Sequence, residues 1–124
     1  MAETALVTGA RGFVGAWLAN ALLDRGADVI SLDKGGTERA VSTLGLLGID
    51  GEVEDVSGDL NDGELIERLL SEQRVGAVFH LAAETIVGSV QESPVRGFET
   101  NVRGTWTLLE ACRRTGVERV VVAS

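Results

Sequence analysis

The sequence predicts an α/β fold, an open and doubly wound parallel sheet with helices on both faces, in three αβα layers. Short β-branched or apolar runs alternate with longer segments of helical spacing. A glycine-rich turn directly follows the first apolar run and opens the first helical segment. Several runs, such as residues 120–122, are apolar throughout, which is typical of strands covered on both faces.

Five short strands are expected. They are predicted at residues 4–7, 28–32, 52–56, 77–81 and 119–123. Strands joined by helical crossovers are parallel, and these crossovers are nearly always right-handed. The expected strand order is therefore 3-2-1-4-5. A ligand crevice would lie at the carboxyl ends of the strands, between the first and the fourth, because the order reverses there.

Four helical segments are expected between the strands. They are predicted at residues 13–25, 37–47, 61–73 and 94–115. Gly26 and Gly116 follow the first and last segments, where a left-handed C-terminal cap favours glycine. Pro94 suits the first turn of the last helix, which Gly104 is expected to interrupt.

Composition limits the class of protein. The chain has 124 residues, 44% of them hydrophobic, which indicates a single compact domain. Nineteen acids against eleven bases give a net charge of −8, which argues against nucleic-acid and basic membrane-surface binding. The chain begins without a basic signal-peptide segment, and no apolar run is long enough to span a membrane. Cys112 alone cannot form an internal disulfide or a multi-cysteine metal cluster, so we expect a packed thiol, a cytoplasmic location and no metal site.

The strongest chemical signal is the turn at residues 8–15, in which Gly9, Gly12 and Gly15 follow a GxxGxxG spacing. In this strand–turn–helix context, Gly9 permits a tight turn and Gly12 lets backbone amides approach a pyrophosphate. Gly15 lets the helix and the strand pack closely. Arg11, inside the turn, is expected either to approach a phosphate or to point into solvent.

An acidic residue closes the second predicted strand, roughly 20 residues after the glycine turn, where a carboxylate can accept both ribose hydroxyls of an adenosine. This residue, Asp33, favours NAD, because a 2′-phosphate would be repelled. Lys34 beside it leaves some room for NADP.

Asp59 follows the third predicted strand at the edge of the same crevice. It could accept a hydrogen bond from the adenine amino group, or serve as an acid favoured by the dipole at a helix N-terminus. Asn61 or Asp62 can cap the helix that follows. Residues 50–72 hold nine of the nineteen acids, and most of these are interpreted as a solvated face.

His80 ends the fourth predicted strand, with no serine, cysteine or metal-ligand set near it in sequence. A packed, hydrogen-bonded histidine is therefore expected rather than a general base. The small residues Ala82 and Ala83 would let the backbone approach a cofactor opposite the glycine turn. Trp17 and Trp106 are interpreted as core or interface residues, since no basic groove surrounds them.

Taken together, these motifs resemble the extended short-chain dehydrogenase/reductases. Within that group the chain is most similar to the NAD-dependent epimerase/dehydratase family acting on nucleotide sugars. The resemblance spans essentially the whole chain in the correct order and spacing. It rests on residues 8–15, Asp33, residues 58–60, residues 80–83, Ser89, Pro94, Phe98 and residues 100–111.

This resemblance implies a Rossmann fold that binds NAD, with NADP less favoured, and a nucleotide-sugar substrate that is transiently oxidised by hydride transfer to NAD. In such enzymes a YxxxK tyrosine takes the hydroxyl proton, and a serine or threonine polarises the substrate oxygen. The residues implied as cofactor contacts are Gly9, Gly12, Phe13, Val14 and Gly15 at the pyrophosphate, Asp33 at the ribose, Asp59 and Leu60 at the adenine, Leu81, Ala82 and Ala83 along the cofactor, and Asn101 beside the site.

The chain departs from the family at the catalytic pair. It has no tyrosine, and its only lysine is Lys34, so it contains no YxxxK motif. Ser124 could belong to the serine and threonine cluster, although the next position in the family could equally supply the catalytic hydroxyl. Residues 1–124 are thus expected to be an NAD(P)-binding portion truncated before the catalytic segment. A homodimer through the helix at residues 94–115 is implied by the resemblance.

Two alternatives remain open. One is a stand-alone NAD(P)-binding module or redox sensor without turnover, against which an apolar strand at the sheet edge argues, because self-contained proteins usually cover such edges. The other is an NADP-dependent carbonyl reductase of the same superfamily, which Asp33 disfavours.

Overall fold

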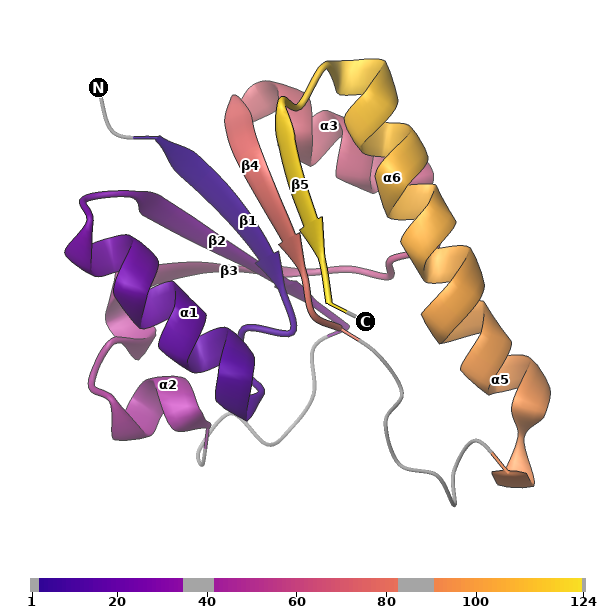
Figure 1. Ribbon diagram of the computed structural model, residues 1–124, viewed down its shortest axis with the longest axis horizontal. Helices are drawn as coiled ribbons and strands as arrows, with labels where there is room; N and C mark the ends of the chain where they lie inside the picture. The colour runs from indigo at the N-terminus through magenta and orange to yellow at the C-terminus, as the bar shows by residue number, and fades with distance from the viewer. Residues whose placement is uncertain (1–2, 35–41, 83–90, 124) are drawn as a thin grey trace.

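A computed structural model describes residues 3–34, 42–82 and 91–123. Its sheet has five parallel strands in the order β3-β2-β1-β4-β5 (Figure 1), so the predicted order is confirmed. The strands are β1 (Thr4–Thr8), β2 (Asp28–Asp33), β3 (Val53–Ser57), β4 (Val75–His80) and β5 (Arg119–Val122). None of their bounds differs from the prediction by more than about two residues. Apolar and β-branched residues mark most of the strands, although β3 (VEDVS) carries two acids at its centre.

The helices lie on both faces of this sheet, with α1 and α2 on one side and α3 and α6 on the other (Figure 1). They are α1 (Phe13–Asp24), α2 (Thr43–Leu46), the 3₁₀ turn η2 (Asp50–Glu52), α3 (Gly63–Glu72), α5 (Pro94–Phe98), the π-helical turn η3 (Glu99–Arg103) and α6 (Gly104–Thr115). The three predicted αβα layers are thus present. Of the helix expected at residues 37–47, α2 is the described part, and residues 37–41 lie outside the described residues.

Most of the helix ends follow the predicted signals. Gly26 and Gly116 have φ angles of +83° and +74°, in the left-handed region that glycine adopts without steric cost. Of the two candidate caps of α3, Asp62 is the one used, since its side chain accepts a hydrogen bond from the Leu65 amide at 3.2 Å. Pro94 stands at the start of α5.

The prediction that Gly104 interrupts the last helix is wrong. Residue 104 is helical, with φ −58° and ψ −41°, and α5 passes into α6 through the π-helical turn η3 just before it. A Cβ atom at Gly104 would lie 3.3 Å from the Leu60 Cβ. Gly104 therefore lets the helix pack closely on the segment after β3 instead of ending it.

Two hydrophobic cores flank the sheet, and neighbouring residues of β1 supply both. Leu6 packs in the core beneath α3 and α6, together with Leu108 and Ile66. Val7 packs in the core beneath α1 and α2, together with Leu44. Because successive strand residues point to opposite faces, a strand between two helical layers has to be apolar throughout.

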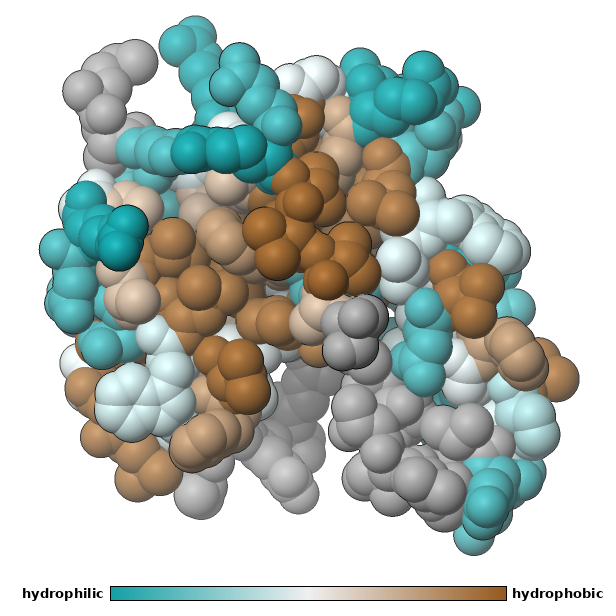
Figure 2. Space-filling view, viewed as in Figure 1, coloured by the Kyte–Doolittle hydropathy of each residue, from teal (hydrophilic) through white to brown (hydrophobic). Residues whose placement is uncertain are grey.

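Strand β5 differs, because it forms the edge of the sheet and is only partly covered. Val121 and Val122 are 54% and 40% exposed, so the expected cover on both faces is not found in the described part of the chain. Figure 2 shows apolar side chains gathered on this side of the molecule.

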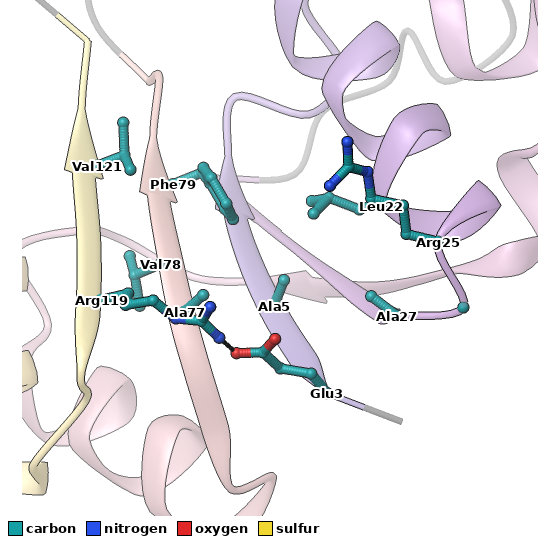
Figure 3. Close-up of a pocket in the computed structure, with 11 residues that line it drawn as sticks. Glu3, Ala5, Leu22, Arg25, Ala27, Ala77, Val78, Phe79, Arg119 and Val121 are labelled. Carbon is teal, nitrogen blue, oxygen red and sulfur yellow. Dashed lines mark ion pairs between the residues drawn. The ribbon is translucent and has the colours of Figure 1, made fainter. Parts of the chain in front are cut away.

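A hollow beside β5 is lined by Leu22 and Ala27 from the α1 side and by Phe79 and Val121 from β4 and β5 (Figure 3). An ion pair between Glu3 and Arg119 lies at one end of this hollow. Glu3 and Ala27 immediately precede β1 and β2, and the lining includes neither the glycine turn nor the residues that follow the strands. It is therefore a different place from the predicted crevice at the carboxyl ends.

The structure also shows how far Cys112, Trp17 and Trp106 are buried. Cys112 is buried in the core, and burial raises the pKa of its thiol, which confirms the expected packed cysteine. Trp17 and Trp106 are 49% and 59% exposed, so neither is a core residue of this chain.

No helix within the described ranges is both long and apolar enough to cross a bilayer.

Candidate functional site

The glycine turn connects β1 to α1 and lies against the end of β4. Gly9 has a φ of +77°, and a Cβ atom there would lie 2.9 Å from the Ala82 amide nitrogen. A Cβ atom on Gly15 would lie 2.0 Å from the Gly9 carbonyl oxygen. Both positions therefore require glycine, in agreement with the tight turn predicted at Gly9 and the close packing predicted at Gly15.

The first turn of α1 presents backbone amides without a side-chain cap. Gly12 is the N-cap residue, and its amide donates to the Gly9 carbonyl at 3.0 Å. Helical bonding starts with the Ala16 amide, which donates to the Gly12 carbonyl at 3.0 Å. The amides of Phe13, Val14 and Gly15 precede that bond, and no acidic residue stands in this first turn. Such a helix end is suited to an anion, which supplies acceptors to the amides and a charge favoured by the dipole.

Arg11 does not point into solvent, and only 18% of its side chain is exposed. Its Nε lies 3.2 Å from an Asp33 oxygen, and its Nη2 lies 2.5 Å from an Asp55 oxygen and 3.5 Å from an Asp50 oxygen. The solvent alternative for Arg11 is therefore wrong. Its guanidinium joins the glycine turn to the end of β2, to η2 and to the middle of β3.

Asp33 closes β2 at the carboxyl edge of the sheet, as expected, and is about one-quarter exposed. Asp50 and Asp55 were not expected here, because the acids of residues 50–72 were interpreted mainly as a solvated face. Asp55 lies opposite Ser31 in the β2–β3 register, which turns its side chain toward the glycine turn. The predicted strand order places β3 beside β2, so this order was the signal that could have identified Asp55.

His80 is the last residue of β4, at its carboxyl end, and is 3% exposed. Its Nδ1 is 2.7 Å from the Thr8 hydroxyl, and its Nε2 is 2.9 Å from the Thr105 hydroxyl. The Thr8 hydroxyl also accepts from the amides of Leu81 and Ala82, each at 3.1 Å. The histidine is therefore packed and hydrogen-bonded, as predicted.

The proton positions of this network follow from its partners. With both lone pairs of Thr8 Oγ1 accepting from amides, its hydrogen is directed to His80 Nδ1. The Thr105 hydroxyl donates to the Asn101 carbonyl at 2.9 Å, so it accepts from His80 Nε2. The hydrogen bonds at the two ring nitrogens therefore both require a neutral imidazole protonated at Nε2. Burial also lowers the pKa of His80, which favours the same neutral form.

This network brings three predicted residues together. The amides of Leu81 and Ala82 are held on Thr8, opposite the glycine turn. Asn101 lies in the π-helical turn, and its carbonyl is linked to the end of β4 through Thr105 and His80. Thr8 and Thr105 were missed by sequence reasoning. Both lie in motifs that carry the family resemblance, and the order β1-β4 could have indicated the contact of Thr8, whereas no local pattern indicated that of Thr105.

The remaining predicted residues are more dispersed. Asp59 is exposed and accepts a hydrogen bond from the Asn61 amide at 3.0 Å, while Asp62 caps the helix. Leu60 packs against the core beneath α3 and α6. Phe13, Val14 and Lys34 are exposed, and Ala83, Ser89 and Ser124 lie outside the described residues. No cluster of three metal-ligating side chains occurs within the ranges that the structure describes.

Comparison with known proteins gives a consistent result. Residues 5–124 match a sequence model described as the NAD dependent epimerase/dehydratase family. A UDP-glucose 4-epimerase from Azospirillum brasilense is 33% identical over 121 residues, which are 96% of this chain and 32% of that protein. A dTDP-glucose 4,6-dehydratase from Xanthomonas campestris pv. campestris is 40% identical over 110 residues, 89% of this chain and 31% of that protein.

A solved structure of the UDP-glucose 4-epimerase from Thermus thermophilus in complex with NAD superposes with a TM-score of 0.78 at 39% identity. The match covers 95% of this chain and 36% of the epimerase. The chain thus spans about one-third of the length of the relatives that it matches.

Proposed function

The chain belongs to the NAD-dependent epimerase/dehydratase family, and from that premise we propose that it is the NAD-binding portion of an enzyme that acts on a nucleotide sugar. The observation that carries this proposal is the glycine turn between β1 and α1. Two of its glycines stand where a Cβ atom would collide with backbone, and the turn leads into a helix end without an acidic residue. A pyrophosphate fits this arrangement.

The residues present fit NAD at both ends of the proposed site. The amides of Phe13, Val14 and Gly15 would hold the pyrophosphate. Asp33, at the end of β2, would accept the ribose hydroxyls. Leu81, Ala82 and Asn101, which are linked to one another through the His80 network, would line the path of the cofactor toward the reacting sugar.

When bound, NAD supplies a reversible hydride acceptor. The residues of this chain would bind and orient it, because the chain contains neither a tyrosine nor a second lysine for the family's catalytic pair. Epimerisation or dehydration of the sugar, as in the relatives named above, would then need residues outside this sequence, with Ser124 or a following residue as the proposed polarising hydroxyl.

Isothermal titration of the chain with NAD and with NADP tests the proposal. We expect saturable binding of NAD and weaker binding of NADP. The variant D33N should weaken NAD binding by about tenfold, since a carboxylate accepts both hydroxyls more strongly than an amide. The matched control is D28N, an exposed aspartate at the opposite end of the same strand, which should bind like the unaltered chain. Absence of NAD binding by the unaltered chain would overturn the proposal.

An intact-mass measurement on the protein from its native source addresses the alternative of a stand-alone module. A mass well above the 13.0 kDa of this sequence would support an enzyme of which the chain is one portion. A mass of 13.0 kDa with NAD binding would support a module without turnover. Tighter binding of NADP than of NAD would favour a carbonyl reductase.

The helix at residues 94–115 also supports the expected homodimer. Apolar side chains recur along it every three or four residues and are between 41% and 73% exposed, namely Val95, Phe98, Val102, Trp106 and Leu109. The proposed partner is the same helix of a second copy. Analytical ultracentrifugation should detect a dimer that W106E dissociates, while W17E, at the exposed tryptophan of α1, leaves it intact. A monomer at all concentrations would contradict the dimer.

A further inference from the structure

Arg11 is held among three carboxylates that come from three different elements: Asp33 from β2, Asp50 from η2 and Asp55 from β3. The four groups carry one positive and three negative formal charges. Arg11, Asp33 and Asp55 are 18%, 26% and 22% exposed, so water and salt screen their interactions less than those of a surface pair.

The three carboxylates do not hold Arg11 in the same way. Asp55 and Asp50 accept hydrogen bonds from Nη2, at 2.5 Å and 3.5 Å. Asp33 lies 3.2 Å from Nε, but this approach lacks hydrogen-bond geometry, since Nε is buried without a hydrogen-bond partner. Asp55 and Asp50 therefore fix the orientation of the guanidinium, whereas Asp33 contributes attraction alone.

This arrangement bears on the ribose end of the proposed cofactor site. NADP differs from NAD by a 2′-phosphate, which adds about −1.5 to −2 charges and several strong acceptor oxygens. A guanidinium is the side chain whose geometry best matches a phosphate, so an arginine beside Asp33 would by itself favour NADP. Here its Nη2 already donates to Asp55 and Asp50, and its Nε and Nη1 are buried without a hydrogen-bond partner among the described residues. The surrounding carboxylates also leave the cluster with a net negative charge.

We propose that Asp55 and Asp50 are specificity-determining residues, which favour NAD over NADP by hydrogen bonding Arg11 and so withholding its guanidinium from a 2′-phosphate. They act through Arg11, and the inference rests on the proposed function, because it needs a dinucleotide bound with its ribose at Asp33.

The test measures the ratio of the dissociation constants for NADP and NAD by isothermal titration. In D50N/D55N this ratio should fall by about tenfold, chiefly through tighter NADP binding, because two repelling charges are removed and Arg11 is released. The matched control is E52Q/E54Q, which removes two negative charges from the same segment at exposed residues that do not contact Arg11. Its ratio should stay within about twofold of the unaltered chain.

A further variant separates release of Arg11 from a general change in charge. In R11Q/D50N/D55N the gain in NADP affinity should disappear. If the gain persists without Arg11, then the exposed Lys34 or the overall charge carries it, and the inference is wrong. An unchanged ratio in D50N/D55N would also overturn it.

The single variant D50N and the binding of NAD by the unaltered chain distinguish the possible negative results. If circular dichroism shows that D50N/D55N does not fold, the single variant D50N, at the most exposed of the three carboxylates, should shift the ratio in the same direction by a smaller factor, and an unshifted ratio would refute the inference. If the unaltered chain and the control bind NAD but the ratio does not respond, the specificity role alone fails. If neither binds any dinucleotide, the proposed function fails and the inference fails with it.

Discussion

Strands β1 and β5 have similar sequences and very different surroundings. Both are runs of β-branched and apolar residues, TALVT and RVVV. Four of the five residues of β1 are buried between two helical layers, whereas Val121 of β5 is 54% exposed at the edge of the sheet. An apolar run thus predicts that a strand forms, but the position of the strand in the sheet decides what covers it.

The difference also separates two parts of the molecule. The end of β1 leads into the glycine turn, the His80 network and the Arg11 cluster, so the proposed binding site lies next to a buried strand. Strand β5 carries none of these contacts. Substitutions near β1 should therefore cost stability, and matched substitutions near β5 or on exposed surfaces should not.

The largest effect is expected at the turn after β1. Gly15→Ala should lower the free energy of unfolding by about 3 kcal/mol, because the added Cβ would lie 2.0 Å from the Gly9 carbonyl oxygen and α1 would have to move. Gly51→Ala is the control, since a Cβ there meets nothing within 4 Å, and it should change stability by less than about 0.5 kcal/mol. Urea unfolding measures both. Equal losses would show that the turn is not tightly packed.

The next effect compares the two strands directly. Val7→Ala should cost about 2 kcal/mol, since it removes two buried methyl groups from a side chain with 0% exposure and leaves a cavity. Val121→Ala makes the same chemical change at a half-exposed position and should cost less than about 0.5 kcal/mol. A similar loss for both variants, measured by urea unfolding, would mean that β5 is covered after all, for example by a second copy.

A pH effect of similar size is expected from the link between β1 and β4. Burial lowers the pKa of His80 below its ordinary value of 6.5, so near that pH the unfolded chain takes up a proton that the folded chain does not. The free energy of unfolding should therefore be highest above pH 6.5. It should fall, by at most about 1.4 kcal/mol per pH unit, as the pH drops from 6.5 toward the lowered pKa.

This slope can be assigned, because His80 is the only histidine in the chain. Urea unfolding of the unaltered protein between pH 7.5 and 5.5, compared with His80→Gln, measures it. The variant should lose the slope. If both proteins show the same dependence, His80 is not buried in its neutral form.

The smallest effect is expected far from β1, on the exposed face of α6. Hydrogen bonds from Arg113 and then Arg114 hold the pKa of Glu110 down at about 2. The contribution of this carboxylate to stability is present above its ordinary pKa of 4.5 and is lost as the pH falls toward 2. Because all three groups are exposed, Glu110→Gln should barely change unfolding at pH 7. NMR titration of the Glu110 carboxyl at low salt and at 1 M salt tests whether this is a surface contact. A titration midpoint that is the same at both salt concentrations would contradict a surface contact screened by salt.

Much of the fold was predictable because its signals are local. Gly26, Gly116 and Pro94 mark helix ends through the backbone angles that glycine and proline favour, and the apolar runs mark strands. The prediction at Gly104 was wrong for a physical reason. The absence of a side chain at Gly104 can end a helix, but it also permits close packing against a neighbouring segment. Only the position of Leu60 shows that close packing is its role here.

The candidate site was predictable in outline for the same reason. The spacing of the glycines and the place of Asp33 after β2 follow from the strand–turn–helix order, and crossover handedness converts that order into neighbouring strand ends. The sequence also indicated that His80 is a packed, hydrogen-bonded residue rather than a general base. It did not indicate that the same histidine positions Leu81, Ala82 and the turn of Asn101.

By itself, then, the sequence determined the five strands, their order and the glycine turn between β1 and α1, because local sequence patterns and chain connectivity are enough for these. Only the tertiary structure decided that Arg11 meets Asp55 and Asp50, that His80 meets Thr8 and Thr105, and that β5 is left half exposed. The partners of Arg11 are 39 and 44 residues away along the chain, and Thr8 is 72 residues from His80. Contacts over such separations depend on how whole elements pack, and no local pattern specifies them.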